Sequence, residues 1–120
     1  EDFGVGFYTK YGDGGVDLSP IADLLKSEVF ALAEHVGVIP EILSAKPTDG
    51  LWGDARNDED QIGATYDELE WAMRYNGDES TLDERQAEVL SIYYRLHAAN
   101  KHKMMPIPVC ELPDTVKYAN

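Results

Sequence analysis

The residues best able to do chemistry lie in a glycine-rich segment near the start of the chain. Residues 10–17 read Lys-Tyr-Gly-Asp-Gly-Gly-Val-Asp, so charges of both signs stand beside three glycines. Glycine lets the backbone approach a ligand closely, and the segment could hold a polar ligand with hydroxyl and phosphate groups. A tight turn before a helix explains the pattern equally well. Thr9 stands where a dinucleotide fingerprint beginning at Gly4 needs its third glycine, and no Gly-Lys-Ser/Thr follows as in a P-loop.

Three further cationic positions are candidates for anion binding. Lys26 lies in a helical pattern but off its apolar stripe, and a solvent-exposed lysine is the simpler interpretation. Residues 46–48 read Lys-Pro-Thr at the start of a long loop. The simpler interpretation is that they anchor the loop, and the more specific one is that they contact a phosphate group. Residues 101–103 read Lys-His-Lys. A helix dipole accounts for part of this basic run, and an anion site is the alternative.

Metal-binding and nucleophile patterns are weak. The histidines at positions 35, 97 and 102 are too scattered for a zinc site, and Cys110 has no second thiolate beside it. No serine stands in a nucleophile-elbow context. Mg²⁺ needs only one or two carboxylates beside phosphate groups, and Glu1 and Asp2 are candidates among many acids.

Composition excludes two classes of partner. The 120 residues include 10 Lys and Arg against 23 Asp and Glu, a formal charge of −13. Nonspecific nucleic-acid binding and attachment to anionic membranes both need clustered cations. No apolar run approaches the roughly 20 residues of a membrane span. A single cysteine fits a reducing cytoplasm, and the length fits one domain. Because the chain opens on Glu1 rather than Met, we expect a fragment of a longer protein.

Helices are the elements expected to position these groups. Residues 1–18 suggest an irregular or strand-like start and a tight loop. Ser19 and Pro20 predict the cap and first turn of a helix that ends at Gly37. Residues 40–43 predict a short helical turn. The apolar residues at helical spacing in the first helix are Ile21, Leu24, Leu25, Val29, Leu32, Ala33 and Val36.

Two capping boxes predict the remaining helices. Thr65 with Glu68 opens a helix to about Tyr75, and Thr81 with Glu84 opens one to about Ala99. Residues 45–63 show no period and predict a long polar loop, while the late prolines predict an extended tail. The fold class expected is mainly α as present, with three main helices, long loops and little strand. The inward side chains expected are Tyr66, Leu69, Met73, Leu82, Val89, Leu90, Tyr93 and Leu96.

Several blocks of the sequence resemble one known family. They are residues 7–17 (Phe-Tyr-Thr-Lys-Tyr-Gly-Asp-Gly-Gly-Val-Asp), Ser19-Pro20-Ile21, Lys26, residues 46–51 (Lys-Pro-Thr-Asp-Gly-Leu), 58–63 (Asp-Glu-Asp-Gln-Ile-Gly), 66–69 (Tyr-Asp-Glu-Leu) and His102-Lys103. In order and spacing they resemble the C-terminal half of ammonia-dependent NAD⁺ synthetases. The resemblance implies the C-terminal part of an α/β adenine-nucleotide α-hydrolase-like fold with a parallel sheet. The family's ATP-binding Ser-Gly-Gly-x-Asp-Ser loop has no counterpart here, so we expect this chain alone to be inactive.

The resemblance implies a reaction and a set of substrate contacts. The reaction is the ATP-dependent amidation of deamido-NAD⁺ by ammonia through an acyl-adenylate, which releases AMP and pyrophosphate. By this resemblance the residues that bind deamido-NAD⁺ are Lys10, Asp17, His102 and Lys103, the last two where two subunits meet.

The same resemblance implies the nucleotide and metal contacts. Lys26 and Thr48 would contact ATP or its pyrophosphate product. Glu1 would hold Mg²⁺, or Asp2 in its place, because the spacing from Glu1 to Lys10 is one residue longer than in many relatives. Asp13 would deprotonate ammonium, and the loop from Gly50 to about Gly63 would order over the nucleotide.

Two alternatives stay open. One is a non-catalytic helical dimerisation or interaction module, which the helices and capping boxes support equally well. The other is the synthetase domain of a glutamine-dependent NAD⁺ synthetase, with an amidohydrolase domain upstream. For the leading interpretation we expect a homodimer in the cytoplasm, with no nucleic-acid or membrane partner.

Overall fold

The computed structural model describes residues 2–12, 14–48, 50 and 57–117, and all regular structure in these ranges is helical. The mainly helical expectation is therefore confirmed, while the parallel sheet of the larger fold is not part of the described ranges. In chain order, the helices are α1 (Asp2–Val5), α2 (Lys26–His35), α3 (Pro40–Leu43), α4 (Asp58–Ile62), α5 (Tyr66–Arg74), a 3₁₀ turn (Glu79–Thr81), α6 (Glu84–Met104) and α7 (Asp114–Lys117). No described helix is long and apolar enough to cross a membrane.

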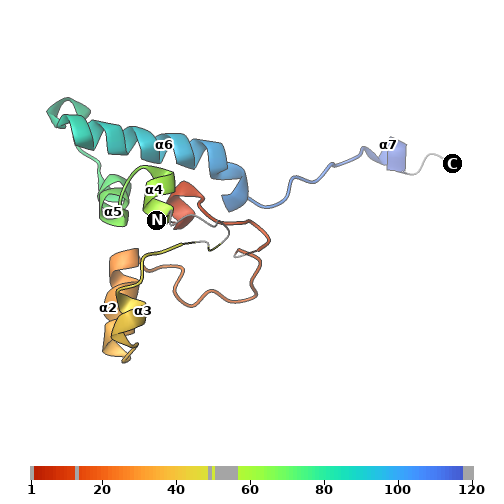
Figure 1. Ribbon diagram of the computed structural model, residues 1–120. Coiled ribbons are helices and arrows are strands. Elements are labelled where there is room, and N and C mark those ends of the chain that lie inside the picture. Colours follow the sequence, from red (N-terminus) through yellow and green to blue (C-terminus); the bar gives the residue numbers. More distant parts are fainter. Residues whose placement is uncertain (1, 13, 49, 51–56, 118–120) are drawn as a thin grey trace.

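The hydrophobic core forms where α1, α4 and α5 pack along one side of α6 (Figure 1). Leu69 of α5 and Val89 of α6 are almost fully buried, and Val5 of α1 is covered to the same degree. The expected inward faces of α5 and α6 are thus confirmed. The buried apolar residues of this core are Val5, Ile62, Ala64, Leu69, Ala72, Val89 and Leu90, with Leu82, Tyr93 and Leu96 packed against them.

Local capping explains where α5 and α6 begin. Thr65 caps α5 as expected, with its hydroxyl accepting a hydrogen bond from the Glu68 amide. The expected cap of α6 at Thr81 is wrong. The Thr81 hydroxyl donates to the Asp78 carbonyl at 2.7 Å and closes the 3₁₀ turn, so Asp83 becomes the cap and accepts from the Gln86 amide at 2.8 Å. The helix also runs past Ala99 to Met104.

Two other boundaries differ from the sequence expectation. Helix α2 begins at Lys26 rather than Pro20, because residues 20–24 form tight turns in which the Ala22 amide binds the Ser19 carbonyl. Its predicted end is confirmed at Gly37, which takes a left-handed φ of 82°. The expected strand-like start is instead α1, and the expected polar loop contains α4, which ends at the left-handed Gly63.

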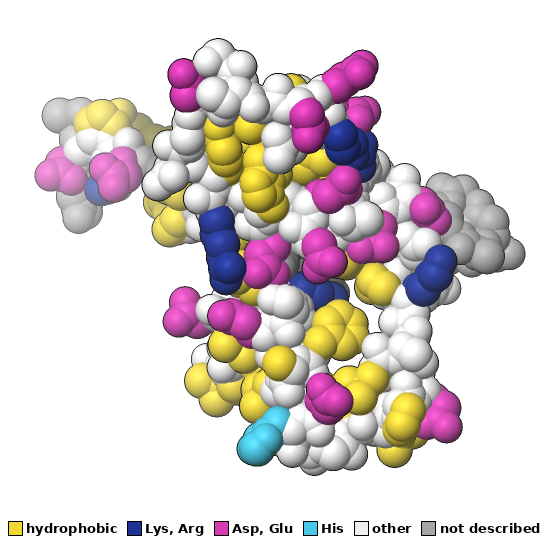
Figure 2. Space-filling view, turned by 90° about the vertical axis from the view of Figure 1, so that its left-hand side faces the viewer, with side chains coloured by type: hydrophobic (Ala, Val, Ile, Leu, Met, Phe, Trp, Pro, Cys, Tyr) yellow, Lys and Arg dark blue, Asp and Glu magenta, His cyan; other side chains and the backbone are white. Residues whose placement is uncertain are grey.

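Helices α2 and α3 stand away from the core, and neither contains a buried residue (Figure 1). Their apolar side chains lie exposed in the lower part of Figure 2. The Cα radius of gyration is 18.9 Å, against about 14 Å for a compact chain of this length. The accessible surface is 9061 Å², against about 6,500 Å² for a compact protein of this mass. The described helices therefore leave much surface that a compact chain would cover.

Candidate functional site

Two lysines far apart in the sequence form a reciprocal clasp at the C-terminal end of α6. The Lys10 ammonium donates to the carbonyl oxygens of His102 at 2.6 Å and Met105 at 2.5 Å. In return, the Lys103 ammonium donates to the Gly6 carbonyl at 2.7 Å. The last carbonyls of a helix have no partner within it and carry partial negative charge, so a cation is stabilised there. The clasp thus fixes the glycine-rich segment against α6.

The clasp borders a cavity of about 600 Å³. The Lys10 ammonium lies 5.5 Å from the centre of the Tyr11 ring, and the Lys103 ammonium lies 5.8 Å from the centre of the Tyr8 ring. Two cations beside two aromatic rings suit a ligand that is both anionic and planar. The lining residues are Tyr8, Lys10, Tyr11, Gly14, Lys103, Met104, Met105, Pro106 and Ile107.

The glycines of residues 10–17 are needed for the turn itself. The amides of Gly12 and Gly14 both donate to the Thr9 carbonyl, at 3.0 and 3.2 Å. A Cβ atom at Gly14 would lie 2.7 Å from the Lys10 carbonyl oxygen, and one at Gly15 would lie 2.8 Å from the Tyr11 carbonyl oxygen. The glycines therefore build a tight turn that delivers Lys10 to the cavity, and the helix expected directly after this turn begins only at Lys26.

Lys26 lies in a second cavity of about 500 Å³. It is the first residue of α2, half-buried, and its ammonium lies 4.6 Å from the centre of the Tyr66 ring. The simple expectation of a solvent-exposed lysine is wrong, because the late start of α2 turns this position toward α5. The residues that line this cavity are Gly4, Ser19, Ile21, Ala22, Asp23, Leu24, Leu25, Lys26, Val29 and Met73.

The position of α5, and so of Tyr66, is held by Arg85 on α6. Its guanidinium forms a bidentate pair with Glu68, both bonds at 2.8 Å, and also donates to the Gly63 carbonyl at 3.2 Å. Hydrogen bonding from Arg85 lowers the pKa of Glu68 to about 2, and that pair raises the pKa of Arg85. The aromatic wall facing Lys26 is therefore braced by a charge-assisted fork between two helices.

The other predicted site residues are more dispersed. His102 is exposed beside Lys103, and its Nδ1 lies 3.2 Å from the Ala99 carbonyl oxygen. Asp17 and Thr48 are exposed in loops, with the Thr48 hydroxyl accepting from the Gly50 amide at 3.2 Å, and neither lines the two cavities above. Glu1 and Asp13 lie outside the described residues. The structure thus brings Lys10, His102 and Lys103 together and places Lys26 elsewhere.

The ligand set predicted for Mg²⁺, Glu1 or Asp2, lies outside the side chains that the structure describes. The described residues contain no cluster of three or more His, Cys, Asp or Glu side chains that could hold a metal ion. A nucleotide-bound Mg²⁺ needs fewer protein ligands, because phosphates and waters complete its octahedron. Asp2 lies two residues before Gly4, which lines the Lys26 cavity.

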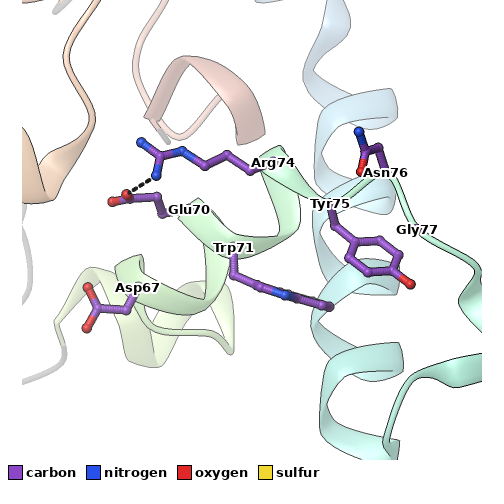
Figure 3. Close-up of a pocket in the computed structure, with 7 residues that line it drawn as sticks. All are labelled: Asp67, Glu70, Trp71, Arg74, Tyr75, Asn76 and Gly77. Atoms are coloured by element: carbon purple, nitrogen blue, oxygen red, sulfur yellow. Dashed lines mark ion pairs between the residues drawn. The ribbon is translucent and has the colours of Figure 1, made fainter.

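A third cavity, of about 520 Å³ on α5, was not expected from the sequence (Figure 3). Glu70 and Arg74 form an ion pair at 3.3 Å, and the Trp71 and Tyr75 ring centres lie 5.1 Å apart. Both pairs have the i, i+4 spacing that brings side chains together on a helix, a signal readable in the sequence. Glu70 also accepts from the Ser27 hydroxyl at 2.8 Å, which ties α2 to α5. Since these groups pair with one another, we assign the cavity no chemistry.

Comparison with known proteins gives a consistent result. The family model described as NAD synthase matches residues 1–106. A protein of Picrophilus torridus is 39% identical over 116 residues, which are 95% of this chain and 44% of that protein. A protein of Archaeoglobus fulgidus is 40% identical over 111 residues, 92% of this chain and 43% of that protein. Both are named NH(3)-dependent NAD(+) synthetase. The chain spans less than half the length of these relatives.

Proposed function

The chain belongs to the NAD synthase family, and from this premise we propose that it forms the C-terminal half of an ammonia-dependent NAD⁺ synthetase. In the proposed reaction the nicotinate carboxylate of deamido-NAD⁺ attacks the α-phosphorus of ATP and displaces pyrophosphate. Ammonia then attacks the acyl-adenylate carbonyl, AMP leaves, and one proton is lost as the amide of NAD⁺ forms. The observation that carries the proposal is the clasp of Lys10 and Lys103 beside one aromatic cavity.

The clasp cavity is proposed as the dinucleotide subsite. Lys10 uses two of its three N–H groups on the carbonyls of His102 and Met105, in and directly after the last turn of α6, which leaves one for a phosphate oxygen. Tyr8 and Tyr11 offer aromatic faces for a planar ring. His102 and Asp17, both exposed, are proposed as further dinucleotide contacts on the family resemblance alone. An ammonium held in place by backbone carbonyls gives up little conformational entropy when it binds an anion.

The Lys26 cavity is proposed as the subsite for ATP. The Lys26 ammonium neutralises charge on the α-phosphate and on departing pyrophosphate, with the Thr48 hydroxyl as a second contact. Glu1 or Asp2 would hold Mg²⁺ beside α1, and the bound ion would supply further neutralisation of the phosphates. The half-buried Lys26, packed over Tyr66, lies where water is partly excluded, and this favours both charge stabilisation and survival of the adenylate.

Asp13 is proposed to accept a proton from ammonium, which generates the nucleophilic ammonia. Its neighbours Gly12 and Gly14 lie in the turn that delivers Lys10 to the clasp, so this carboxylate belongs to the same segment as the dinucleotide contact. A carboxylate there attracts ammonium and repels the hydroxide that would hydrolyse the intermediate.

A homodimer is proposed as the assembled form. Phe30, Leu32 and Val36 of the α2 region and Ile39 and Ile42 around α3 are exposed, and an apolar surface of this kind is typical of an interface. The same observation favours the second candidate, a helical interaction module without catalysis.

The proposal predicts that Lys10→Ala in the full-length enzyme raises the KM for deamido-NAD⁺ by about tenfold or more, with a smaller change in the KM for ATP. Steady-state NAD⁺ formation measures both. Lys117→Ala is the matched control, because Lys117 lies on α7 beyond both cavities and pairs only with Asp114 among the described contacts. Equal kinetic constants in the two variants would contradict the dinucleotide assignment.

Residues 1–120 alone are expected to form no NAD⁺ from deamido-NAD⁺, ATP and ammonia. Isothermal titration of the full-length protein distinguishes the two candidates. Binding of deamido-NAD⁺ supports the synthetase, whereas self-association without such binding supports the interaction module.

A further inference from the structure

Three side chains on one face of α6 bind three consecutive backbone carbonyls at the end of α1. Nδ1 of His97 lies 2.7 Å from the Gly4 carbonyl oxygen. The Asn100 amide donates to the Val5 carbonyl at 3.0 Å, and the Lys103 ammonium donates to the Gly6 carbonyl at 2.7 Å. A helix of four residues leaves its last carbonyls without internal partners. His97, Asn100 and Lys103, hereafter the α6 row, supply hydrogen-bond donors to these carbonyls from α6.

The contact behind these hydrogen bonds is tight. Gly6 has a left-handed φ of 68°, and a Cβ atom there would lie only 2.2 Å from the Asn100 Cβ. The backbone of Gly6 therefore rests directly on Asn100. Val5, one residue earlier, is 1% exposed, and the His97 ring lies 5.8 Å from that of Tyr93. The Asn100 side chain on α6 and the buried Val5 on α1 thus fix the position of α1 along α6.

Both proposed subsites depend on the segment that this row holds. On one side of Val5, Gly4 lines the Lys26 cavity, and the acids at the chain start lie two and three residues before it. On the other side, Gly6 leads within four residues to Lys10, whose ammonium binds the end of α6. A shift of α1 along α6 would therefore move the start of the chain, where the proposed metal ligands lie in the sequence, together with Lys10.

We propose that His97 and Asn100 are positioning residues that set the distance between the nucleotide and dinucleotide subsites through α1. This inference rests on the proposed function. Neither residue lines the two cavities, so they act through Gly4, Val5 and Lys10 rather than on a substrate. Lys103 closes the same row and also borders the dinucleotide cavity, which makes it both a member of the row and a substrate contact.

The test compares substitutions that remove or keep the donor group in the full-length enzyme. Asn100→Ala and His97→Phe remove the donor, whereas His97→Asn keeps an N–H at a position close to Nδ1. We expect the first two to lower kcat/KM by roughly five- to tenfold for both substrates, and His97→Asn to restore most of it. Asn76→Ala, in the exposed turn after α5, is the matched control and should change neither constant.

A merely structural role would lower the unfolding temperature and leave the kinetic constants of the folded enzyme at wild-type values, and that result would overturn the positioning role. Coupling predicts that kcat/KM falls for both substrates, so a fall for deamido-NAD⁺ alone would also overturn the positioning role. If the wild-type enzyme forms no NAD⁺, the proposed function fails on its own account. Hydrogen exchange at amides 6–12 then decides the inference: faster exchange in Asn100→Ala than in Asn76→Ala supports the row, and equal exchange refutes it.

Discussion

The α6-centred unit, made of α1, α4, α5 and α6, is held together in a different way from the α2–α3 unit. The first buries Val5, Leu69 and Val89 almost completely and adds side-chain bonds to helix ends. The second contains no buried residue. It meets α5 through Ser27 on Glu70 and Lys26 over Tyr66. Lys10 and Lys103, the proposed dinucleotide contacts, are thus bonded to the well-packed unit, while Lys26, the proposed nucleotide contact, lies between the two units.

This difference matters for how each subsite can respond to a ligand. Lys10 and Lys103 are held by carbonyls within one packed unit, which keeps them in place before binding. Lys26 is at the first turn of a helix whose other contacts are few, so small movements of α2 change its distance to α5 at low cost. We therefore expect preformed geometry for the dinucleotide and closure on binding for the nucleotide.

The largest expected effect comes from the core of the α6-centred unit. Leu69→Ala removes a side chain with 0% exposure and should lower the free energy of unfolding by about 3–5 kcal/mol. Leu32→Ala on α2, where Leu32 is 42% exposed, should cost less than about 1 kcal/mol. Urea unfolding monitored by circular dichroism measures both. Similar losses in the free energy of unfolding for the two variants would show that the two units do not differ in how much their apolar side chains stabilise the fold.

A pair of glycines gives the next largest contrast. Gly6→Ala should cost roughly 2–3 kcal/mol, because the new methyl group meets Asn100 and the left-handed φ is strained. Gly37→Ala at the end of α2 has a similar φ of 82° but open space around it, and should cost about 1 kcal/mol. Thermal unfolding of the two variants side by side tests this. An equal drop would show that Gly6 does not pack closely on α6.

The smallest expected effect is a pH dependence of the α6-centred unit. The pKa of Glu68 is about 2 when folded, below its ordinary value of 4.5, because Arg85 donates to it. Its contribution is therefore complete above about pH 4.5 and is lost as pH falls toward 2. Glu68→Gln should lower stability by about 1 kcal/mol at pH 7 and flatten its decline between pH 4.5 and 2.

Urea midpoints at pH 7, 4.5 and 3 provide the measurement for this prediction. Glu34→Gln on α2 is the control, and its midpoint should follow the wild-type pH dependence. If Glu68→Gln keeps the wild-type dependence of stability on pH, the pair of Arg85 with Glu68 does not stabilise the packing of α5 on α6.

The parts of the fold that could be predicted from the sequence are those with a local cause. Thr65 and Glu68 cap α5 because the two partners lie three residues apart. Gly37 follows the end of α2 with a φ of 82°, which glycine adopts without strain. The start of α2 could not be predicted in this way. Ser19 and Pro20 carry a helix-start signal, but the amides of Ala22 and Leu24 form turn hydrogen bonds instead. The helix begins at Lys26, after the cap residue Leu25, whose amide donates to the Glu28 carboxylate.

The candidate site was predicted residue by residue but not as an arrangement. Lys10 and Lys103 could be named from their motifs, but their bonds to carbonyls more than 90 residues away depend on how α1 packs on α6. His97 and Asn100 carry no motif, because their partners are backbone atoms, and any sequence presents the same carbonyl. The start of the chain was expected to be irregular or strand-like because short apolar pieces alternate with glycines. Local propensity does not register that the carbonyls of α1 find their partners on α6.

The clasp also has a consequence for the order in which the chain folds. The bond from Lys103 to Gly6 joins residues 97 positions apart, so forming it closes a loop almost as long as the chain itself. Closing such a loop costs entropy that only the finished core repays. We expect the clasp to be absent from the folding transition state, with kinetic φ-values near zero at Lys10 and Lys103. An anion bound between them would then slow unfolding without speeding folding, so a dinucleotide would lengthen the lifetime of the native state.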